Sequence, residues 1–294
     1  MKWSIPAKTF LLGEYAAIHS ASALLVTTTP AFVISLGTKA SAETIHPQSP
    51  GGVWWLQQET KEYSLQCNDP YKGQGGLGAS SAQFVGSYLA SCYLNGTQPS
   101  LKELLVAYYL CAWNQKGLRP SGYDVIAQTQ SGCVFINKKE QNLQTYSWPF
   151  EDLSFFLIHT GNKLATHQHL QHATLPANVE SLSSIVDKAK NAIETQDSML
   201  FVDCINQYHQ QLQEARLVAP HSITLINQLN HYPEILAIKG CGALGSDVLL
   251  VISASNQAKS LQDKLIQHDY LVLATEDDIA PQNATSTLFS HIDQ

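Results

Sequence analysis

The sequence predicts an α+β protein with two domains: an N-terminal α/β domain over residues 1–150 and a C-terminal ferredoxin-like domain over residues 151–294. A chain of 294 residues is long enough for two domains of ordinary size. Pro149 and the two acidic residues after Phe150 mark the expected boundary. Beyond it, strand and helix patterns follow in the order β-α-β-β-α-β, which is the split arrangement of ferredoxin-like domains.

The composition argues against several functions. The net charge is −7 and no block of like charge occurs, which disfavours nucleic-acid and anionic-membrane surfaces. No apolar run approaches the length that spans a bilayer, and the first residues lack the apolar run of a signal peptide. The six cysteines form no C-x-x-C pair. We therefore expect a cytoplasmic protein that captures small anions locally.

The N-terminal region begins with two β-type runs, residues 9–18 and 23–36, which are rich in apolar and β-branched side chains. Lys8 and Glu14 are charged positions that bracket the apolar part of the first run. Such charges are either solvent groups at strand ends or residues of a site. This segment alone leaves both interpretations open.

Two further strands, expected at residues 53–56 and 63–67, lead into a glycine-rich segment at residues 72–82. This segment has four glycines within six positions, 73–78, so few side chains keep a ligand away from the main chain. Apolar residues at helical spacing follow from Phe84. The loop therefore presents a helix N-terminus with unsatisfied N–H groups, which predicts an anion site, most economically for phosphate.

Two common glycine motifs do not explain this loop. A dinucleotide-binding Gly-x-Gly-x-x-Gly needs a strand directly before it, whereas residues 68–71 read as a turn. A P-loop needs a closing Lys-Ser/Thr pair, which is missing. Ser80 and Ser81 instead occupy the first helical turn, where a hydroxyl can cap N–H groups or bind a metal carried by phosphates. A glycine turn with serine caps and no ligand remains the alternative.

A second helical pattern covers residues 101–112, and a stiff turn at residues 119–125 then presents one acid, Asp124. An apolar strand follows at residues 133–136. An Asp in a Ser-Gly-x-Asp turn usually stabilises the turn through its side chain. A catalytic role for Asp124 is the alternative.

The C-terminal region contains a second Gly-x-Gly-x-x-Gly, within residues 239–247, between two predicted strands. This segment is either a hairpin-like turn or a second backbone surface that closes over the same phosphates. The elements expected around it are strands at 153–159, 235–238, 248–252 and 270–273, a helix at 256–267, and extra helices between 179 and 230.

Three segments in this order, residues 6–15, 76–82 and 240–245, resemble the three motifs of the GHMP small-molecule kinases. The turn at residues 121–124 looks like the segment that carries the catalytic acid of that family. The resemblance spans nearly the whole chain. It implies an ATP- and Mg²⁺-dependent kinase whose site lies between the two domains, with a small molecule as the binding partner. Neither nucleic acid nor membrane is expected as a partner, and a homodimer is compatible with the resemblance.

The resemblance also implies roles for individual residues. Asp124 would accept the proton of the substrate hydroxyl, and Lys8 would keep that carboxylate ionised. Ser80 would be the hydroxyl nearest Mg²⁺. Substrate contacts would come from Glu14, Thr160 and Gly161. The ATP phosphates would be bound by Gly75, Gly76, Leu77, Gly78, Ala79, Ser80, Ser81, Gly242 and Gly245.

Within the family, the chain is most similar to the mevalonate-pathway members. Glu14 within Gly-Glu-Tyr, Asp124 within Ser-Gly-x-Asp-Val, and Asp247 after the last glycine turn resemble phosphomevalonate kinases. Mevalonate kinases tend to have a metal-binding Glu in the stretch matching residues 112–116, which has no acid here. We expect transfer of the ATP γ-phosphate to phosphomevalonate, with mevalonate as the alternative acceptor. A sugar or amino-alcohol kinase, or a non-catalytic binding protein with an altered third motif, are the remaining alternatives.

Overall fold

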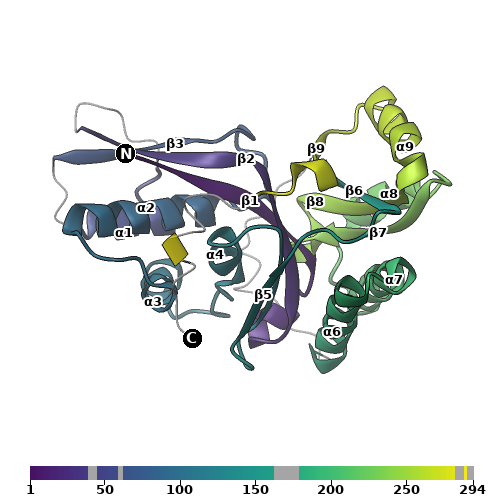
Figure 1. The fold of residues 1–294 in the computed structure, drawn as a ribbon, viewed down its shortest axis with the longest axis horizontal. Helices are drawn as coiled ribbons and strands as arrows, with labels where there is room; N and C mark the ends of the chain where they lie inside the picture. The colour runs from purple at the N-terminus through teal and green to yellow at the C-terminus, as the bar shows by residue number, and fades with distance from the viewer. Residues whose placement is uncertain (39–44, 59–61, 162–178, 282–287, 290–294) are drawn as a thin grey trace.

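The computed structural model describes residues 1–38, 45–58, 62–161, 179–281 and 288–289. Within these residues it contains two antiparallel sheets, each covered by helices (Figure 1). None of the described helices has both the length and the apolar content needed to cross a lipid bilayer. The cavity described below lies where the two sheets meet.

The first sheet is built on one long strand that takes different partners along its length. Strand β2 pairs with β3 through residues 33–38 and with β4 through residues 23–26, while β1 pairs with nearly all of it. The order is β1-β2-β4-β5, with β3 on β2. The strands are β1 (Lys2–Leu12), β2 (Ala23–Thr38), β3 (Tyr63–Asn68), β4 (Cys133–Asn137) and β5 (Asn142–Tyr146).

Helices α2 and α4 both contact β1 and β2, and α1 and α3 pack on these two helices (Figure 1). Helices α2 and α4 also contact each other. The short helix η1 (Ala16–His19) follows β1. The helices of this layer are α1 (Pro50–Leu56), α2 (Ala79–Asn95), α3 (Leu101–Ala112) and α4 (Tyr123–Gln128).

The second sheet has the order β7-β8-β6-β9, and all of its pairings are antiparallel. Its chain order is β-α-β-β-α-β with additional helices after the first strand, so the ferredoxin-like prediction is confirmed. The strands are β6 (Leu153–His159), β7 (Ile235–Cys241), β8 (Val248–Ala254) and β9 (Val272–Thr275). The helices are α6 (Val179–Thr195), α7 (Ser198–Glu214), α8 (Pro220–Leu229) and α9 (Ser255–Gln267), with short turns η2 (Ala243–Gly245) and η3 (Glu276–Asp278).

The end of the second region returns to the first sheet. Ile279 bridges Thr28 of β2, and the Ala280 N–H donates to the Thr27 carbonyl oxygen at 2.9 Å. One apolar core runs through both regions. The division at residues 150 and 151 stays a prediction.

The strand expected at residues 53–56 is wrong, because these residues belong to helix α1. Ser49 is the N-cap, and its hydroxyl accepts a hydrogen bond from the Gly52 N–H at 3.1 Å. Pro50 occupies the first helical turn, where its missing N–H costs nothing. These two start signals outweigh the β-propensity of the apolar residues that follow.

Candidate active site

A cavity of about 340 Å³ lies between the first and second sheets. Its wall contains parts of the three motif segments and of the turn with the candidate acid: the end of β1, the glycine loop, the third glycine motif and the turn before α4. The predicted site residues on this wall are Lys8, Glu14, Gly75, Gly76, Gly78, Ala79, Ser80, Ser81, Asp124 and Gly242.

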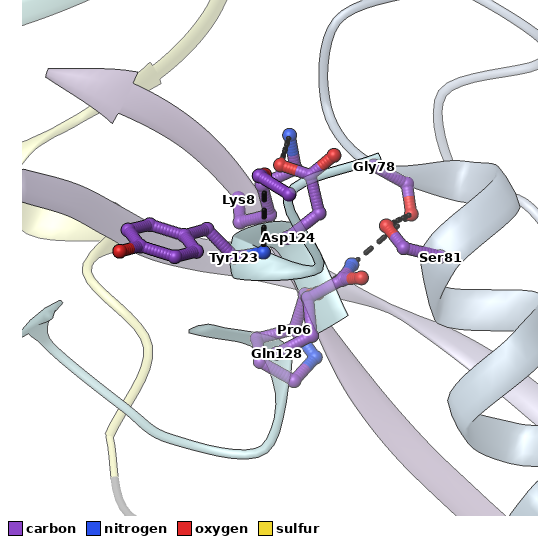
Figure 2. A network of polar contacts seen from close by, with 8 residues as sticks. Pro6, Lys8, Gly78, Ser81, Tyr123, Asp124 and Gln128 are labelled. Carbon is purple, nitrogen blue, oxygen red and sulfur yellow. Dashed lines mark hydrogen bonds and ion pairs between the residues drawn. The ribbon is translucent and has the colours of Figure 1, made fainter. Parts of the chain in front are cut away.

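The glycine loop is held to its neighbours through two of its own main-chain carbonyl groups. Gly78 is the N-cap of α2 and adopts a left-handed conformation, with φ 83°. Its carbonyl oxygen accepts a hydrogen bond from the Gln128 side chain at 3.1 Å, and the Leu77 carbonyl oxygen accepts one from the Lys8 N–H at 3.1 Å. Figure 2 shows Gln128 reaching Gly78 beside the start of α2. The first amides of α2, which have no helical acceptor, are therefore fixed at the cavity wall.

The two serines at the start of α2 have different environments. Ser81 is buried, and its hydroxyl donates to the Gly78 carbonyl oxygen at 3.0 Å. Ser80 is exposed on the cavity wall, and its hydroxyl makes no hydrogen bond to the rest of the described chain. Ser80 is therefore the hydroxyl placed to reach a ligand, while Ser81 stabilises the loop.

Lys8 and Asp124 form the central ion pair of the cavity. Lys8 Nζ lies 2.6 Å from Asp124 Oδ1 (Figure 2). The Lys8 side chain is 8% exposed and that of Asp124 is 33% exposed, so the pair faces the cavity from a shielded position. The pair also touches the glycine loop, because a Cβ atom on Gly78 would lie 2.9 Å from Lys8 Cε.

Asp124 is carried by a helix that the sequence did not predict. We expected a turn, whereas the structure has a left-handed Gly122, with φ 77°, followed directly by α4. Asp124 is the second residue of this helix. The apolar residues after it, Val125 to Ala127, are buried and hold the helix on the sheet. Helix α4 has six residues, too short to be indicated by periodicity.

Glu14 faces the cavity but is already paired. Its Oε1 lies 3.1 Å from Nζ of Lys239 on β7, and Lys239 is fully buried. Burial raises the pKa of Glu14, and the Lys239 charge opposes that rise. The next residue, Tyr15, accepts a hydrogen bond from the Leu244 N–H at 3.1 Å. Residues 14 and 15 therefore bind the first motif to the third.

Four predicted site residues do not line the cavity within the described structure. Leu77 is buried and contributes its carbonyl oxygen to Lys8, as described above. Gly245 packs on Gly240, where a side chain would collide with backbone. Thr160 donates its N–H to the Asp247 carbonyl oxygen at 3.1 Å and so anchors the start of β8, and Gly161 is exposed.

Sequence reasoning missed Tyr108 and Gln128 among the residues that build this site. Tyr108 of α3 lines the cavity; burial, together with the nearby charge of Asp124, raises the pKa of its phenol. Its helical spacing had indicated only a core position. The buried Gln128 amide donates both to the Pro6 carbonyl oxygen at 2.8 Å and to Gly78. No sequence signal identifies such a bridge, because its acceptors are main-chain atoms far away along the chain.

The comparisons with solved structures cover almost the whole chain. Mevalonate kinase of Methanococcus jannaschii is 14% identical, with a TM-score of 0.71, over 96% of this chain and 98% of that one. Phosphomevalonate kinase of Streptococcus pneumoniae, in complex with phosphomevalonate and AMPPNP, is 14% identical, with a TM-score of 0.73, over 94% and 99%. Galactokinase of Lactococcus lactis, complexed with galactose, is 9% identical, with a TM-score of 0.72, over 92% of each chain. No protein-family model and no curated protein sequence matches the chain.

The chain therefore has the fold of the GHMP small-molecule kinases, which confirms the fold predicted from its motifs. Both mevalonate-pathway kinases named above share this fold with it. At these identities the likeness does not distinguish one acceptor from another.

Proposed function

We propose that this protein is an ATP-dependent kinase that phosphorylates a small acceptor of the mevalonate pathway. The observation that carries the proposal is the 2.6 Å ion pair of Lys8 and Asp124, which lies against the glycine loop at the N-terminus of a long helix. Phosphoryl transfer depends on positioning and charge neutralisation in a shielded site. A protein that only binds a nucleotide has no need of such a pair.

The glycine loop would bind the phosphates of ATP. The first amides of α2 provide donors, and the helix dipole favours negative charge there. The third motif lies on the same cavity through Gly242 and Asp247, so it would close over the nucleotide from the second sheet. These two backbone surfaces come from distant parts of the chain and meet only in the folded protein.

The donor set suits Mg²⁺ that arrives with ATP. No group of three or more His, Cys, Asp or Glu side chains in the described residues could hold a metal by itself. Magnesium usually takes one or two protein ligands, with phosphate oxygens and waters completing its shell. Ser80 would supply one such ligand, and the ion would neutralise phosphate charge when bound.

Asp124 and Lys8 would act on the acceptor. The carboxylate would receive a proton from the attacking oxygen, which becomes a stronger nucleophile as the proton leaves. The ammonium group would stabilise the ionised carboxylate and the negative charge that develops on that oxygen. Both groups face the same cavity as Ser80, so the acceptor and the phosphates would be held together.

We propose phosphomevalonate as the acceptor, on the strength of the motif details around Glu14, Asp124 and Asp247. Mevalonate is the second candidate, and the site itself favours it. The attacking group of phosphomevalonate is a phosphate monoester, whose second pKa is about 6, so it is already ionised at neutral pH and needs no base. The attacking group of mevalonate is an alcohol, which does need a base such as Asp124. Within the described wall, Lys8 is the one Lys or Arg side chain, and it is already paired with Asp124.

The proposal is tested by ADP release from the purified protein with Mg²⁺-ATP, offered phosphomevalonate, mevalonate and galactose in parallel. Turnover with phosphomevalonate alone supports the first candidate, and turnover with mevalonate alone supports the second. Turnover with galactose alone would place the activity outside the mevalonate pathway. Bound ATP without turnover on any acceptor would contradict the kinase proposal and favour a binding protein.

A further inference from the structure

We propose that Tyr109 and Lys138 are positioning residues: together they hold the turn before α4 and thereby fix Asp124 against Lys8. The kinetic consequence of this inference rests on the proposed kinase function. Neither residue lines the cavity, and neither was singled out by the motifs. The evidence is a set of contacts that converge on the main chain just before Asp124.

The carbonyl oxygen of Ser121, three residues before Asp124, accepts two hydrogen bonds. The Tyr109 hydroxyl donates to it at 2.8 Å, and Lys138 Nζ donates to it at 2.6 Å. Lys138 Nζ also donates to the Tyr109 hydroxyl oxygen at 2.8 Å. Tyr109 belongs to α3, whereas Lys138 directly follows β4. Two separate elements therefore hold one carbonyl group.

The next two residues of the turn make contacts with the same pair. Gly122 is left-handed, and a Cβ atom there would lie 2.7 Å from the Tyr109 hydroxyl oxygen. Tyr123 is fully buried; its hydroxyl donates to the Ala21 carbonyl oxygen at 2.8 Å and accepts from the Lys138 N–H at 3.1 Å. Lys138 therefore holds the turn through both its main chain and its side chain.

These contacts matter for Asp124 because α4 is short. A six-residue helix is not stable by itself, so its orientation depends on what surrounds it. The buried side chains after Asp124 fix the inner face of α4, while the turn fixes its first residues. Figure 2 shows Tyr123 pointing away from the Lys8–Asp124 pair, toward the contacts that its hydroxyl makes with Ala21 and Lys138. Misplacing a reacting group by about 1 Å can cost about 100-fold in rate.

The charges around Lys138 add a property that can be measured. Its neighbours are the rings of Tyr109 and Tyr123, 5.4 Å and 5.1 Å from Nζ, and Arg119, whose guanidinium lies 4.5 Å from the centre of the Tyr109 ring. No carboxylate in the described chain forms an ion pair with Lys138. Burial, and then the charge of Arg119, lower the pKa of Lys138 to about 8. Burial raises the pKa values of both tyrosines, so they stay protonated where Lys138 titrates.

The test uses Tyr109→Phe, Lys138→Met and Lys138→Arg, with Lys139→Met as the matched control. Lys139 is the exposed neighbour of Lys138, and its side chain is not part of these contacts. We expect Tyr109→Phe and Lys138→Met to lower kcat by about 10- to 100-fold with an unchanged KM for ATP, because the glycine loop is untouched. Lys138→Arg should recover part of this loss, since Arg keeps the charge and the N–H donors.

The pH profile gives a second kinetic signature. As pH rises through about 8, Lys138 loses its proton and its charge-assisted hydrogen bonds weaken. Wild-type kcat should therefore fall above this pH, and the fall should be absent in Lys138→Arg, which remains charged. An identical alkaline profile in both proteins would contradict this part of the inference.

Amide hydrogen exchange tests the inference without relying on activity. In Tyr109→Phe and Lys138→Met, exchange should become faster in residues 119–126 and stay unchanged in α2. Unchanged exchange with unchanged kcat would overturn the inference. Faster exchange across the whole first sheet would also overturn it, because Tyr109 and Lys138 would then stabilise the sheet in general and not the turn in particular. The two failures can be distinguished. If the wild-type protein phosphorylates none of the acceptors but the variants still show faster exchange in residues 119–126, the proposed kinase function is wrong, while the positioning of Asp124 by Tyr109 and Lys138 is supported.

Discussion

Lys239 Nζ lies 3.1 Å from Glu14 Oε1, and this ion pair joins the second sheet to the end of β1. Lys239 has no exposed surface, and the Glu14 side chain is 4% exposed. The Lys239 ammonium also lies 3.8 Å from Cys241 Sγ and 5.6 Å from the centre of the Tyr208 ring. Because Glu14 and the residues after Cys241 both line the cavity, this pair sets how the two regions meet around it.

Removing one partner of this pair should be costly. Lys239→Met leaves the Glu14 carboxylate buried without its counter-ion, and we expect a loss of about 3–5 kcal/mol in the free energy of unfolding, measured in urea. The double variant Lys239→Met with Glu14→Gln should recover much of that loss, since no buried charge remains. The control is Lys259→Met, which breaks an exposed pair with Asp263 and should cost at most about 1 kcal/mol. Equal losses for the two single Lys variants would contradict this prediction.

The glycine loop permits a matched pair of substitutions. Gly78 and Gly73 have nearly the same φ, 83° and 82°, a left-handed value that disfavours a side chain at either position. A Cβ at Gly78 would meet Lys8 Cε at 2.9 Å and Gln128 Nε2 at 3.0 Å, whereas a Cβ at Gly73 would meet no described atom within 4 Å. Gly78→Val should weaken Mg²⁺-ATP binding by about 100-fold or more in calorimetric titration, about 2.7 kcal/mol. Gly73→Val should stay within a few-fold of wild type. Similar affinities for both variants would remove Gly78 from the phosphate site.

Asp124→Asn separates the two candidate acceptors. With an alcohol acceptor the variant should lose about 10²- to 10⁴-fold in kcat, because no group takes the proton. With a phosphate acceptor, which is already ionised, the loss should be much smaller. ATP affinity, measured by titration, should change little because Asp124 lies outside the glycine loop. Near-normal kcat with an alcohol would show that Asp124 is not the base.

His209 on α7 predicts a stability change in mild acid. Burial, and then the positive charge of Lys239, lower the pKa of His209 to about 4, against 6.5 ordinarily. As pH falls below 6.5, His209 therefore becomes protonated in the unfolded state while it stays neutral in the folded state. This contribution to stability is complete above pH 6.5 and is lost as pH falls toward about 4, at no more than about 1.4 kcal/mol per pH unit.

The measurement is the urea midpoint of wild type and His209→Gln between pH 7 and pH 4.5. The variant should show a shallower decline, because Gln has no proton to gain. His231→Gln changes an exposed histidine and serves as the control. Parallel declines in wild type and His209→Gln would show that other groups govern this range.

Helices and strands that are marked by local sequence patterns could be predicted from the sequence. The glycine loop and the helical spacing after it predicted the start of α2, and the strand and helix order beyond residue 151 predicted the second sheet. Local signals also failed where two of them competed: at residues 53–56, a Ser-Pro helix start outweighed β-propensity. Helix α4 was missed because six residues give too little periodicity to detect.

The sequence by itself determined the chemistry available to this protein: a glycine loop for an anion, a candidate lysine and a candidate aspartate elsewhere in the chain, and a second glycine turn. Only the tertiary structure decided which of these groups meet. It paired Lys8 with Asp124 and Glu14 with Lys239, and it joined Gln128 to Gly78. These partners are distant along the chain and come together because separate strands and helices pack on one core. Distance in space is set by that packing, and no pattern of neighbouring residues encodes it.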